Sequence, residues 1–252
     1  MKIILSFLLM ILIAGTVNAQ TQVKAAAKPT IIFVHGVWAD GSSWEAQITA
    51  LQAKGFPVIS VQNPITSLAD DVAATKRAID RAEGNVILVG HSWGGFVITQ
   101  AGNDPKVVGL VYVAAFAPNI DETIPALSAQ APAGKLAQYF APVNGFIYLS
   151  KEGVKTVFAQ DLSAKQQDLI YATQTPAYQS VFADKSGEPA WKTKKSWYVV
   201  AKNDAAINPD LERMMAKRSN AKTIEIEASH VVMLSHAKEV TTLIEEAATS
   251  AK

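Results

Sequence analysis

The stretch VILVGHSWGGFVITQ, residues 86–100, is the most informative part of this chain. An apolar run leads directly into the pentapeptide GHSWG at residues 90–94, and an apolar helical pattern follows it. The pentapeptide matches Gly-x-Ser-x-Gly, in which a sharp turn from a strand to a helix projects a nucleophilic serine above the edge of a sheet. Glycine is favoured at both ends because larger side chains would collide with the turn. A serine that only capped a helix would leave both glycines unexplained, so we interpret Ser92 as a nucleophile.

Apolar runs alternate with amphipathic segments along most of the chain. Most runs are nearly continuous, which is typical of strands that are covered on both faces. The predicted strands are Thr30–Val34, Val58–Val61, Val86–Val89, Val107–Val113, Trp197–Ala201 and Thr223–Ile226. The predicted helices are Trp44–Lys54, Leu68–Ala82, Trp93–Gly102, Pro209–Arg218 and Ala237–Ala248. This alternation predicts the α/β class, with a mostly parallel six-stranded sheet and helices on both faces.

One long interval breaks the alternation between the fourth and fifth predicted strands. Roughly residues 118–195 show mostly helical or irregular patterns. An insertion of this length is typical of a lid or a binding element, so we expect a helical lid. Within it, a capping box at Ser163–Gln166 predicts a helix start. Two further caps are predicted outside it: Asn208 before Pro209, and Ser235 for the last helix.

The N-terminal residues 1–19 have the layout of a cleavable secretory signal peptide. Lys2 precedes an apolar run over Ile3–Ala14, and small residues allow cleavage after Ala19. The run is too short for a membrane anchor, which needs about 20 apolar residues to span a bilayer. We therefore expect a secreted or periplasmic protein with one domain over residues 20–252 and no membrane association after cleavage.

The charge balance limits the partners. The chain has 23 basic and 22 acidic residues, and Lys2 is the only charged residue of the leader, so the mature chain is neutral. A neutral chain gives no reason to expect nucleic acid or an anionic membrane as a partner. The chain has no cysteine, so it forms no disulfide. The expected partner is a small-molecule substrate, and no particular oligomeric state is predicted.

A serine nucleophile needs a base, and the base needs an acid that orients it. The four histidines of the chain are His35, His91, His230 and His236. His91 adjoins Ser92, His35 follows an early strand, and His236 lies at the start of the final helix. His230 follows the last predicted strand, at the carboxyl edge where open α/β sheets bind ligands. We therefore predict His230 as the base.

The orienting acid is expected between the serine and the histidine in chain order. Asp204 follows the fifth predicted strand, at the same edge of the sheet. Asp121 and Glu122 are the alternatives, but they follow the fourth strand and open the insertion. An Asx turn at Asn203–Asp204 is compatible with a catalytic role. We favour Asp204.

The segment after the first strand is predicted to stabilise negative charge on the substrate. Gly36 lets the backbone turn there, so the backbone N–H groups of Val37 and Trp93 are the natural pair of oxyanion donors. Trp38 and Val231 adjoin these predicted catalytic positions. We expect both to line a largely apolar substrate pocket.

Four blocks of the sequence, FVHGVWADGSSW, VILVGHSWGG, VVAKNDAAINP and IEIEASHVVML, resemble the matching blocks of the α/β-hydrolase superfamily. More narrowly, they resemble its small lid-bearing branch of plant hydroxynitrile lyases, methyl-ester esterases and related bacterial hydrolases. The resemblance spans about residues 30–248. It implies the same catalytic triad and oxyanion donors as the residues themselves do. Because only about ten residues of the mature chain precede Thr30, we expect the two leading strands of larger members to be missing.

One departure from that branch bears on the reaction. Lyases of the Ser-Asp-His type carry a lysine beside the catalytic histidine, which stabilises the cyanide leaving group, whereas this chain has Val231 there. We therefore expect a serine hydrolase that cleaves small carboxylic esters or lactones through an acyl-enzyme, with no cofactor and no metal ion. Lyase, perhydrolase or C–C hydrolase chemistry on the same triad stays an alternative. A ligand-binding receptor with weak hydrolysis is the alternative outside enzymes.

Overall fold

Six strands form the central sheet, and every pair of neighbouring strands in it is parallel. The structure, a computed structural model, describes residues 27–251. The strand order is β2-β1-β3-β4-β8-β9. The strands are β1 (Thr30–Val34), β2 (Val58–Val61), β3 (Val86–Ser92), β4 (Val107–Ala115), β8 (Lys195–Ala201) and β9 (Lys222–Ile226). The predicted α/β class with a six-stranded parallel sheet is confirmed.

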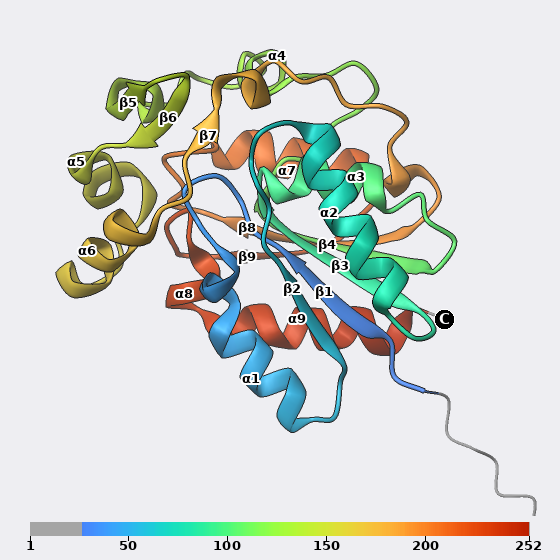
Figure 1. Cartoon of the computed structure of the whole chain (residues 1–252). Helices are drawn as coiled ribbons and strands as arrows, with labels where there is room; N and C mark the ends of the chain where they lie inside the picture. Colours follow the sequence, from blue (N-terminus) through green and yellow to red (C-terminus); the bar gives the residue numbers. More distant parts are fainter. Residues whose placement is uncertain (1–26, 252) are drawn as a thin grey trace, which may run out of the picture.

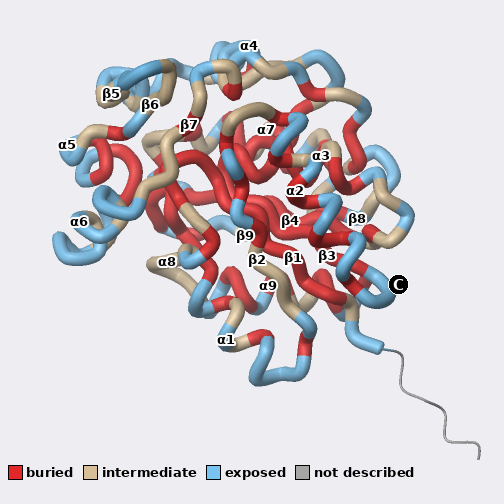
Figure 2. Tube along the Cα trace, in the orientation of Figure 1, coloured by how far each residue is buried: buried red, intermediate tan, exposed pale blue. Residues whose placement is uncertain are grey.

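Helices cover both faces of this sheet (Figure 1). On one face lie α2, α3 and α7, and on the other lie α1 and α9. Buried residues concentrate in the sheet and on the inner sides of these helices (Figure 2), as the continuous apolar runs of β1 and β3 predict. The helices are α1 (Glu45–Ala53), α2 (Leu68–Arg81), α3 (Gly94–Ala101), α7 (Pro209–Arg218), α8 (Val232–Ser235) and α9 (Ala237–Ser250), with the short 3-10 turn η1 (Gly41–Trp44) before α1.

The order of the strands places a switch point between β1 and β3. The chain passes from β1 to β2 on one side and then to β3 on the other. Val34 of β1 pairs with Gly90 of β3, so the loop after β1 lies beside the end of β3. A Cβ atom at Gly36 would lie 2.6 Å from Cβ of Ser92, so only glycine fits this approach. In open α/β sheets, ligands bind beyond the carboxyl ends of the strands at such a point.

The segment between β4 and β8 has its own secondary structure. It forms a three-stranded antiparallel sheet in the order β5-β6-β7, surrounded by short helices. Its strands are β5 (Phe140–Val143), β6 (Phe146–Leu149) and β7 (Ala177–Tyr178). Its helices are α4 (Ile124–Ser128), α5 (Lys151–Gly153) and α6 (Ala164–Thr173), with the 3-10 turns η2 (Leu136–Tyr139), η4 (Gln179–Phe182) and η5 (Ala190–Lys192) and the π-helical turn η3 (Val154–Phe158).

The prediction of a helical insertion is therefore wrong in one respect, because the insertion also contains a three-stranded sheet. Asn144 and Gly145 join β5 to β6, and both have positive φ angles, of 49° and 83°. Asn-Gly is the strongest short hairpin signal, because a type I′ turn needs positive φ at both central residues. The sequence thus contained this signal. That the insertion acts as a lid stays a prediction.

Two of the three predicted helix caps are confirmed. Ser163 and Gln166 form a capping box at α6, and Asn208 caps α7 with proline at its first position. The prediction for Ser235 is wrong. The N-cap of α9 is His236, with no side-chain cap, because Ser235 ends α8 and its hydroxyl lies 2.9 Å from Nδ1 of His236.

The predicted signal peptide, residues 1–19, and the predicted start of the domain at residue 20 lie outside the described residues. Both stay predictions. Within residues 27–251, the structure contains no helix that is both long and apolar enough to cross a membrane.

Candidate active site

Ser92 occupies the strained turn that its sequence context predicts. It ends β3 with a φ angle of 53°, a left-handed conformation that is rare for residues other than glycine. A Cβ atom at Gly90 would lie 2.6 Å from the backbone oxygen of Gly94. One at Gly94 would lie 2.3 Å from the backbone oxygen of Val34. Steric exclusion therefore explains why glycines stand on both sides of the serine.

Asp204 and His230 form a buried hydrogen-bonded pair. Oδ2 of Asp204 lies 2.6 Å from Nδ1 of His230, and the side chains are 0% and 2% exposed. Oδ1 of Asp204 accepts the backbone N–H groups of Ala206 and Ile207, at 2.7 and 2.8 Å. These bonds orient the carboxylate toward the imidazole. A proton on Nδ1 leaves Nε2 as the basic nitrogen of the ring.

Ser92 and His230 line one cavity. None of the hydrogen bonds among the described residues joins them, so what they share is this cavity rather than a bond. Catalytic hydrogen bonds are often long without a substrate and tighten in its complex. The structure thus brings the three predicted triad members to one place, at the switch point of the sheet.

The alternative acids lie elsewhere. Asp121 has a side chain that is 75% exposed, and its carboxylate lies 3.9 Å from Nζ of Lys185. Glu122 forms a 2.5 Å ion pair with Arg218. Neither lines the cavity of Ser92.

The other histidines have structural hydrogen bonds. Nε2 of His35 accepts the backbone N–H of Asn63 at 2.9 Å. Nε2 of the fully buried His91 donates to the backbone oxygen of His230 at 3.0 Å, because a carbonyl oxygen only accepts. Burial lowers the pKa of His91 well below that of an ordinary histidine, so this ring stays neutral. His91 thereby links the serine turn to the loop of His230.

Val37 and Trp93, the predicted oxyanion donors, both line the cavity of Ser92. Neither backbone N–H donates a hydrogen bond to another residue in the part of the chain that the structure describes. The Trp93 side chain is fixed from behind, since its Nε1 donates to Oδ2 of Asp71 at 2.7 Å. Asp71 lies on α2 and is fully buried.

The cavity has a volume of about 310 Å³ and a mostly apolar wall. Its rim combines the ends of β1 and β3, the loops of Asp204 and His230, and the insertion. Among the described residues that line it, none carries a fixed charge. The lining residues are Val37, Trp38, Ser92, Trp93, Phe116, Ile124, Pro125, Ser128, Gly134, Leu136, Ala137, Phe140, Phe182, Ala206, Ile207 and His230.

The two predicted pocket residues have different positions. Trp38 lines the cavity of Ser92, and its ring packs near those of Phe140 and Phe182. Val231 lines a neighbouring cavity of about 270 Å³, for which Trp38 also forms a wall. Sequence reasoning did not assign Phe140 and Phe182 to the pocket, because only the folded insertion brings them to Trp38.

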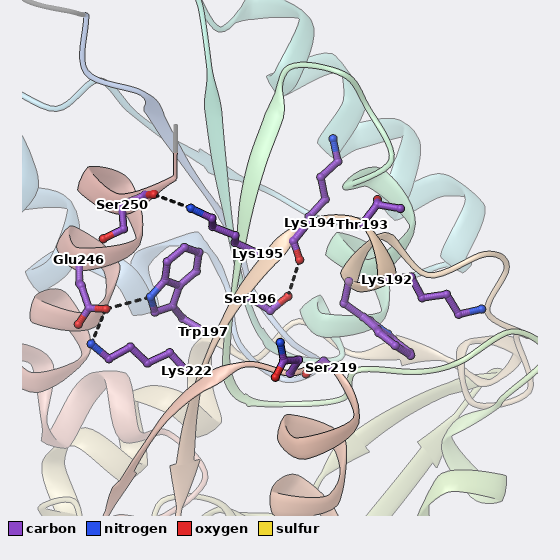
Figure 3. A pocket seen from close by; sticks show the side chains of 12 residues that line it. Lys192, Thr193, Lys194, Lys195, Ser196, Trp197, Ser219, Lys222, Glu246 and Ser250 are labelled. Carbon is purple, nitrogen blue, oxygen red and sulfur yellow. Dashed lines mark hydrogen bonds and ion pairs between the residues drawn. The ribbon is translucent and has the colours of Figure 1, made fainter.

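A lysine-rich groove of about 520 Å³ lies elsewhere on the molecule (Figure 3). It is lined by residues at the start of β8 and β9, the edge of the sheet opposite to that of Ser92. Its charges are partly neutralised, since Lys222 pairs with Glu246 at 2.6 Å and Lys195 donates to the backbone oxygen of Ser250 at 3.1 Å. This groove is separate from the predicted triad.

No group of three or more His, Asp or Glu side chains within residues 27–251 is arranged to hold a metal ion.

A family model described as "Alpha/beta hydrolase family" matches residues 31–243. The chain belongs to this family. As an α/β hydrolase, it has the turn, the sheet edge and the order Ser-Asp-His that the motif requires.

Similar proteins agree with this membership. "Alpha/beta hydrolase nvfD" of Aspergillus novofumigatus is 24% identical over 244 residues, covering 88% of this chain and 97% of that protein. A "Carbendazim hydrolyzing esterase" of Nocardioides sp. is 30% identical over 129 residues, covering 46% of this chain and 52% of that protein.

Solved structures share the fold. A pyrethroid hydrolase of Sphingobium faniae superposes with a TM-score of 0.75 at 20% identity, covering 88% of this chain and 98% of that chain. A polyneuridine aldehyde esterase superposes with a TM-score of 0.74 at 18% identity, covering 87% of this chain and 98% of that chain. At these identities the superpositions establish the fold alone.

Proposed function

We propose that this α/β hydrolase is a serine hydrolase of small, uncharged carboxylic esters or lactones. The observation that carries the proposal is the buried Asp204–His230 pair at 2.6 Å, whose histidine lines an apolar cavity together with the strained Ser92. Such an arrangement supplies a nucleophile, its base and the group that orients the base.

In the first half of the proposed reaction, Oγ of Ser92 attacks the ester carbonyl carbon while Nε2 of His230 takes the hydroxyl proton. The backbone N–H groups of Val37 and Trp93 stabilise the resulting oxyanion; one such donor contributes about 3–4 kcal/mol. The tetrahedral intermediate then collapses, the ester C–O bond breaks, and the imidazolium returns the proton to the leaving alcohol. Asp204 remains ionised and stabilises the imidazolium throughout.

In the second half, water replaces the alcohol. Nε2 of His230 takes a proton from the water as its oxygen attacks the acyl carbon. The bond between this carbon and Oγ of Ser92 then breaks, and the serine regains its proton from the imidazolium. The product is a carboxylic acid, or a hydroxy acid when the substrate is a lactone.

The cavity supports this choice of substrate. A volume of about 310 Å³ is at the lower end of the range for small-molecule sites. Its apolar wall disfavours substrates with a free carboxylate or ammonium group, because burial of an unpaired charge is unfavourable. The names of similar proteins, which include an esterase and pyrethroid hydrolases, support the same reaction class.

The proposal includes a secreted or periplasmic location, which depends on the signal-like leader at residues 1–19. Its test is the N-terminal sequence of the exported protein, which would start after Ala19. An intact leader on the protein recovered from the cytoplasm would contradict it.

A substrate panel tests the proposed activity. Nitrophenyl esters and lactones of increasing acyl length are offered to the wild type and to Ser92→Ala. We expect turnover of short neutral esters by the wild type alone. Turnover of cyanohydrins, peracid formation or C–C cleavage without ester hydrolysis would instead support an alternative reaction on the same triad. Binding of panel members without any turnover would support a receptor.

A further inference from the structure

Glu212 is a buried acid that the proposed reaction does not use. It lies on α7, and it has no exposed surface. Its Oε2 accepts the backbone N–H of Ala201 at 3.1 Å, whereas its Oε1 has no hydrogen-bond donor within residues 27–251. An ionised carboxylate would therefore leave one buried oxygen unsatisfied, which is unfavourable.

Glu212 lies behind Asp204. Ala201 links the two acids, because its N–H donates to Glu212 and its oxygen accepts the N–H of Asp204 at 3.1 Å. Glu212 therefore shares a buried site with Asp204, whose negative charge acts on it. When two carboxyl groups share a buried site, the pKa of one of them is raised, because their like charges disfavour each other.

No cation among the described residues forms an ion pair with Glu212. Tyr198 lies close to it, but the Tyr198 hydroxyl donates to the backbone oxygen of Ala115. Arg213, the next residue, points to the exposed side of α7, where it pairs with Asp210 and Glu225 at 2.7 Å each. Burial first, and then the charge of Asp204, raises the pKa of Glu212 well above its ordinary value.

We propose that Glu212 is a positioning residue that carries a proton and donates it in a hydrogen bond to Asp204. As a neutral acid, Glu212 satisfies both of its oxygens: Oε2 accepts from Ala201, and the hydroxyl at Oε1 donates to the Asp204 carboxylate. This inference depends on the proposed function only in naming Asp204 as the catalytic acid.

The hydrogen bond from Glu212 has two consequences for the triad. Asp204 already accepts bonds from Ala206, Ile207 and His230, and this further bond from the rear fixes the plane of its carboxylate. It also stabilises the negative charge of Asp204, so the proton of the pair stays on Glu212 rather than on the acid that faces His230. Asp204 is thus kept in the charged form that orients the imidazole.

Two substitutions separate this role from simple packing. Glu212→Gln retains the shape and the hydrogen bonds, because the amide oxygen accepts from Ala201 and the amide N–H donates to Asp204. Glu212→Met retains the volume of the side chain and removes both hydrogen bonds. We expect E212M to lower kcat on a short ester by about tenfold to a hundredfold, as for loss of a hydrogen bond to a charged group, with KM little changed. We expect E212Q to restore kcat to within about threefold of the wild type.

The pH dependence of stability provides a readout that needs no substrate. Because folding raises the pKa of Glu212, its contribution to stability is present below its unfolded pKa of 4.5 and is lost as pH rises toward its folded pKa. E212Q does not titrate. Across this window, the folding equilibrium constant of the wild type should fall relative to that of E212Q by about tenfold per pH unit.

Glu239 provides the control, because it is an exposed glutamate on α9. Glu239→Gln and Glu239→Met should leave both kcat and the pH dependence of stability close to those of the wild type. Parallel stability curves for the wild type and E212Q would overturn the inference, and so would full activity in E212M or equal losses in E212M and E212Q. If the wild type hydrolyses no ester, the proposed function fails, while the stability curves still decide whether Glu212 is protonated.

Discussion

His230 and Asp204 are 26 residues apart in the chain, and a 2.6 Å hydrogen bond joins their almost completely buried side chains. The carboxylate is held by two backbone N–H groups, so it has one oxygen left for the imidazole. Each end of the pair follows a neighbouring parallel strand, β8 or β9, at the same edge of the sheet. The sheet therefore fixes the positions of Asp204 and His230 relative to each other before any substrate binds.

Substitution of Asp204 tests this pair. Asp204→Asn should keep the fold but favour the wrong tautomer of His230, and kcat should fall by about a factor of 10³–10⁴. Steady-state hydrolysis of a short ester measures the loss. Asp121→Asn, at the exposed alternative acid, is the matched control and should retain wild-type activity. The assignment of the acid is wrong if D121N is inactive and D204N is not.

Substitution of Gly94 tests the steric basis of the serine turn. Gly94→Ala places a Cβ atom 2.3 Å from the backbone oxygen of Val34, so β1 and the turn must move apart. We expect a loss of about 1–3 kcal/mol in the free energy of unfolding, as for overpacking of a core, together with lower activity. Gly134→Ala is the control for stability, because the nearest atom to its Cβ is 3.5 Å away. Chemical denaturation measures the free energy of unfolding of both variants. Equal stabilities would contradict the steric explanation for glycine at position 94.

Asp71 gives a prediction about pH. Its carboxylate accepts hydrogen bonds from Nε1 of Trp93 at 2.7 Å and from the backbone N–H of Ile65 at 2.9 Å, while burial raises its pKa from 3.8 to about 6. Its contribution to stability is therefore present below about pH 4 and is lost as pH rises to about 6. The free energy of unfolding of the wild type, relative to Asp71→Asn, should fall by about 1.4 kcal/mol per pH unit in this window and then level off.

The neighbouring Asp70 is the control for this titration. The hydroxyl of Ser67 lowers the pKa of Asp70, so its contribution is present above its unfolded pKa and is lost as pH falls. Asp70→Asn should therefore differ from the wild type in the opposite direction, and only under acidic conditions. A wild-type curve that stays parallel to that of D71N from pH 4 to 8 would show that Asp71 does not titrate as described.

Hydrogen bonds connect the insertion to the loops of the predicted triad. Carboxylate oxygens of Asp161 accept both the backbone N–H of Ser229, at 2.9 Å, and the Ser229 hydroxyl, directly before His230. Nε2 of Gln160 donates to the backbone oxygen of Asn203, directly before Asp204, at 2.7 Å. The insertion therefore holds both loops in place.

Loss of this connection should reduce turnover. Asp161→Ala removes two hydrogen bonds to the residue before His230, and we expect kcat to fall by about tenfold or more with little change in the fold. Asp168→Ala is the control in the same insertion, because Asp168 is exposed and forms an ion pair with Lys151 at 2.8 Å. The two variants are compared by ester kinetics and circular dichroism. Equal kcat values in D161A and the wild type would show that the loops keep their positions without the insertion.

The sequence was sufficient to predict the central sheet. The bounds of β1 and β2 agree with their apolar runs, because both runs end at a change of composition. The strands β3 and β4 run further than predicted, to Ser92 and Ala115. These two residues still pair with each other, although the apolar run of β3 is interrupted at Gly90. Backbone pairing thus continues where the hydrophobic pattern stops.

The insertion and the burial of Glu212 were harder to predict from the sequence. No residue of α6 is buried, so it lacks the apolar face from which helices of the body were predicted. Glu212 stands in a polar helical sequence, PDLERMMAKR, in which a glutamate suggests an exposed face. Its burial depends on contact between α7 and β8, which one sequence does not reveal. The candidate triad residues were easier to predict, because each lies at or just after the carboxyl end of a strand of the sheet.

Covalent labelling identifies the nucleophile. The folded wild type and Ser92→Ala are treated with a fluorophosphonate, and the modified peptide is located by mass spectrometry. Ser128→Ala is the matched control, because Ser128 lines the same cavity. We predict a single adduct on Ser92 in the wild type and in S128A, accompanied by loss of ester hydrolysis, and no adduct in S92A. An adduct on another residue, or ester hydrolysis that persists in folded S92A, would contradict the assignment of Ser92 as the nucleophile.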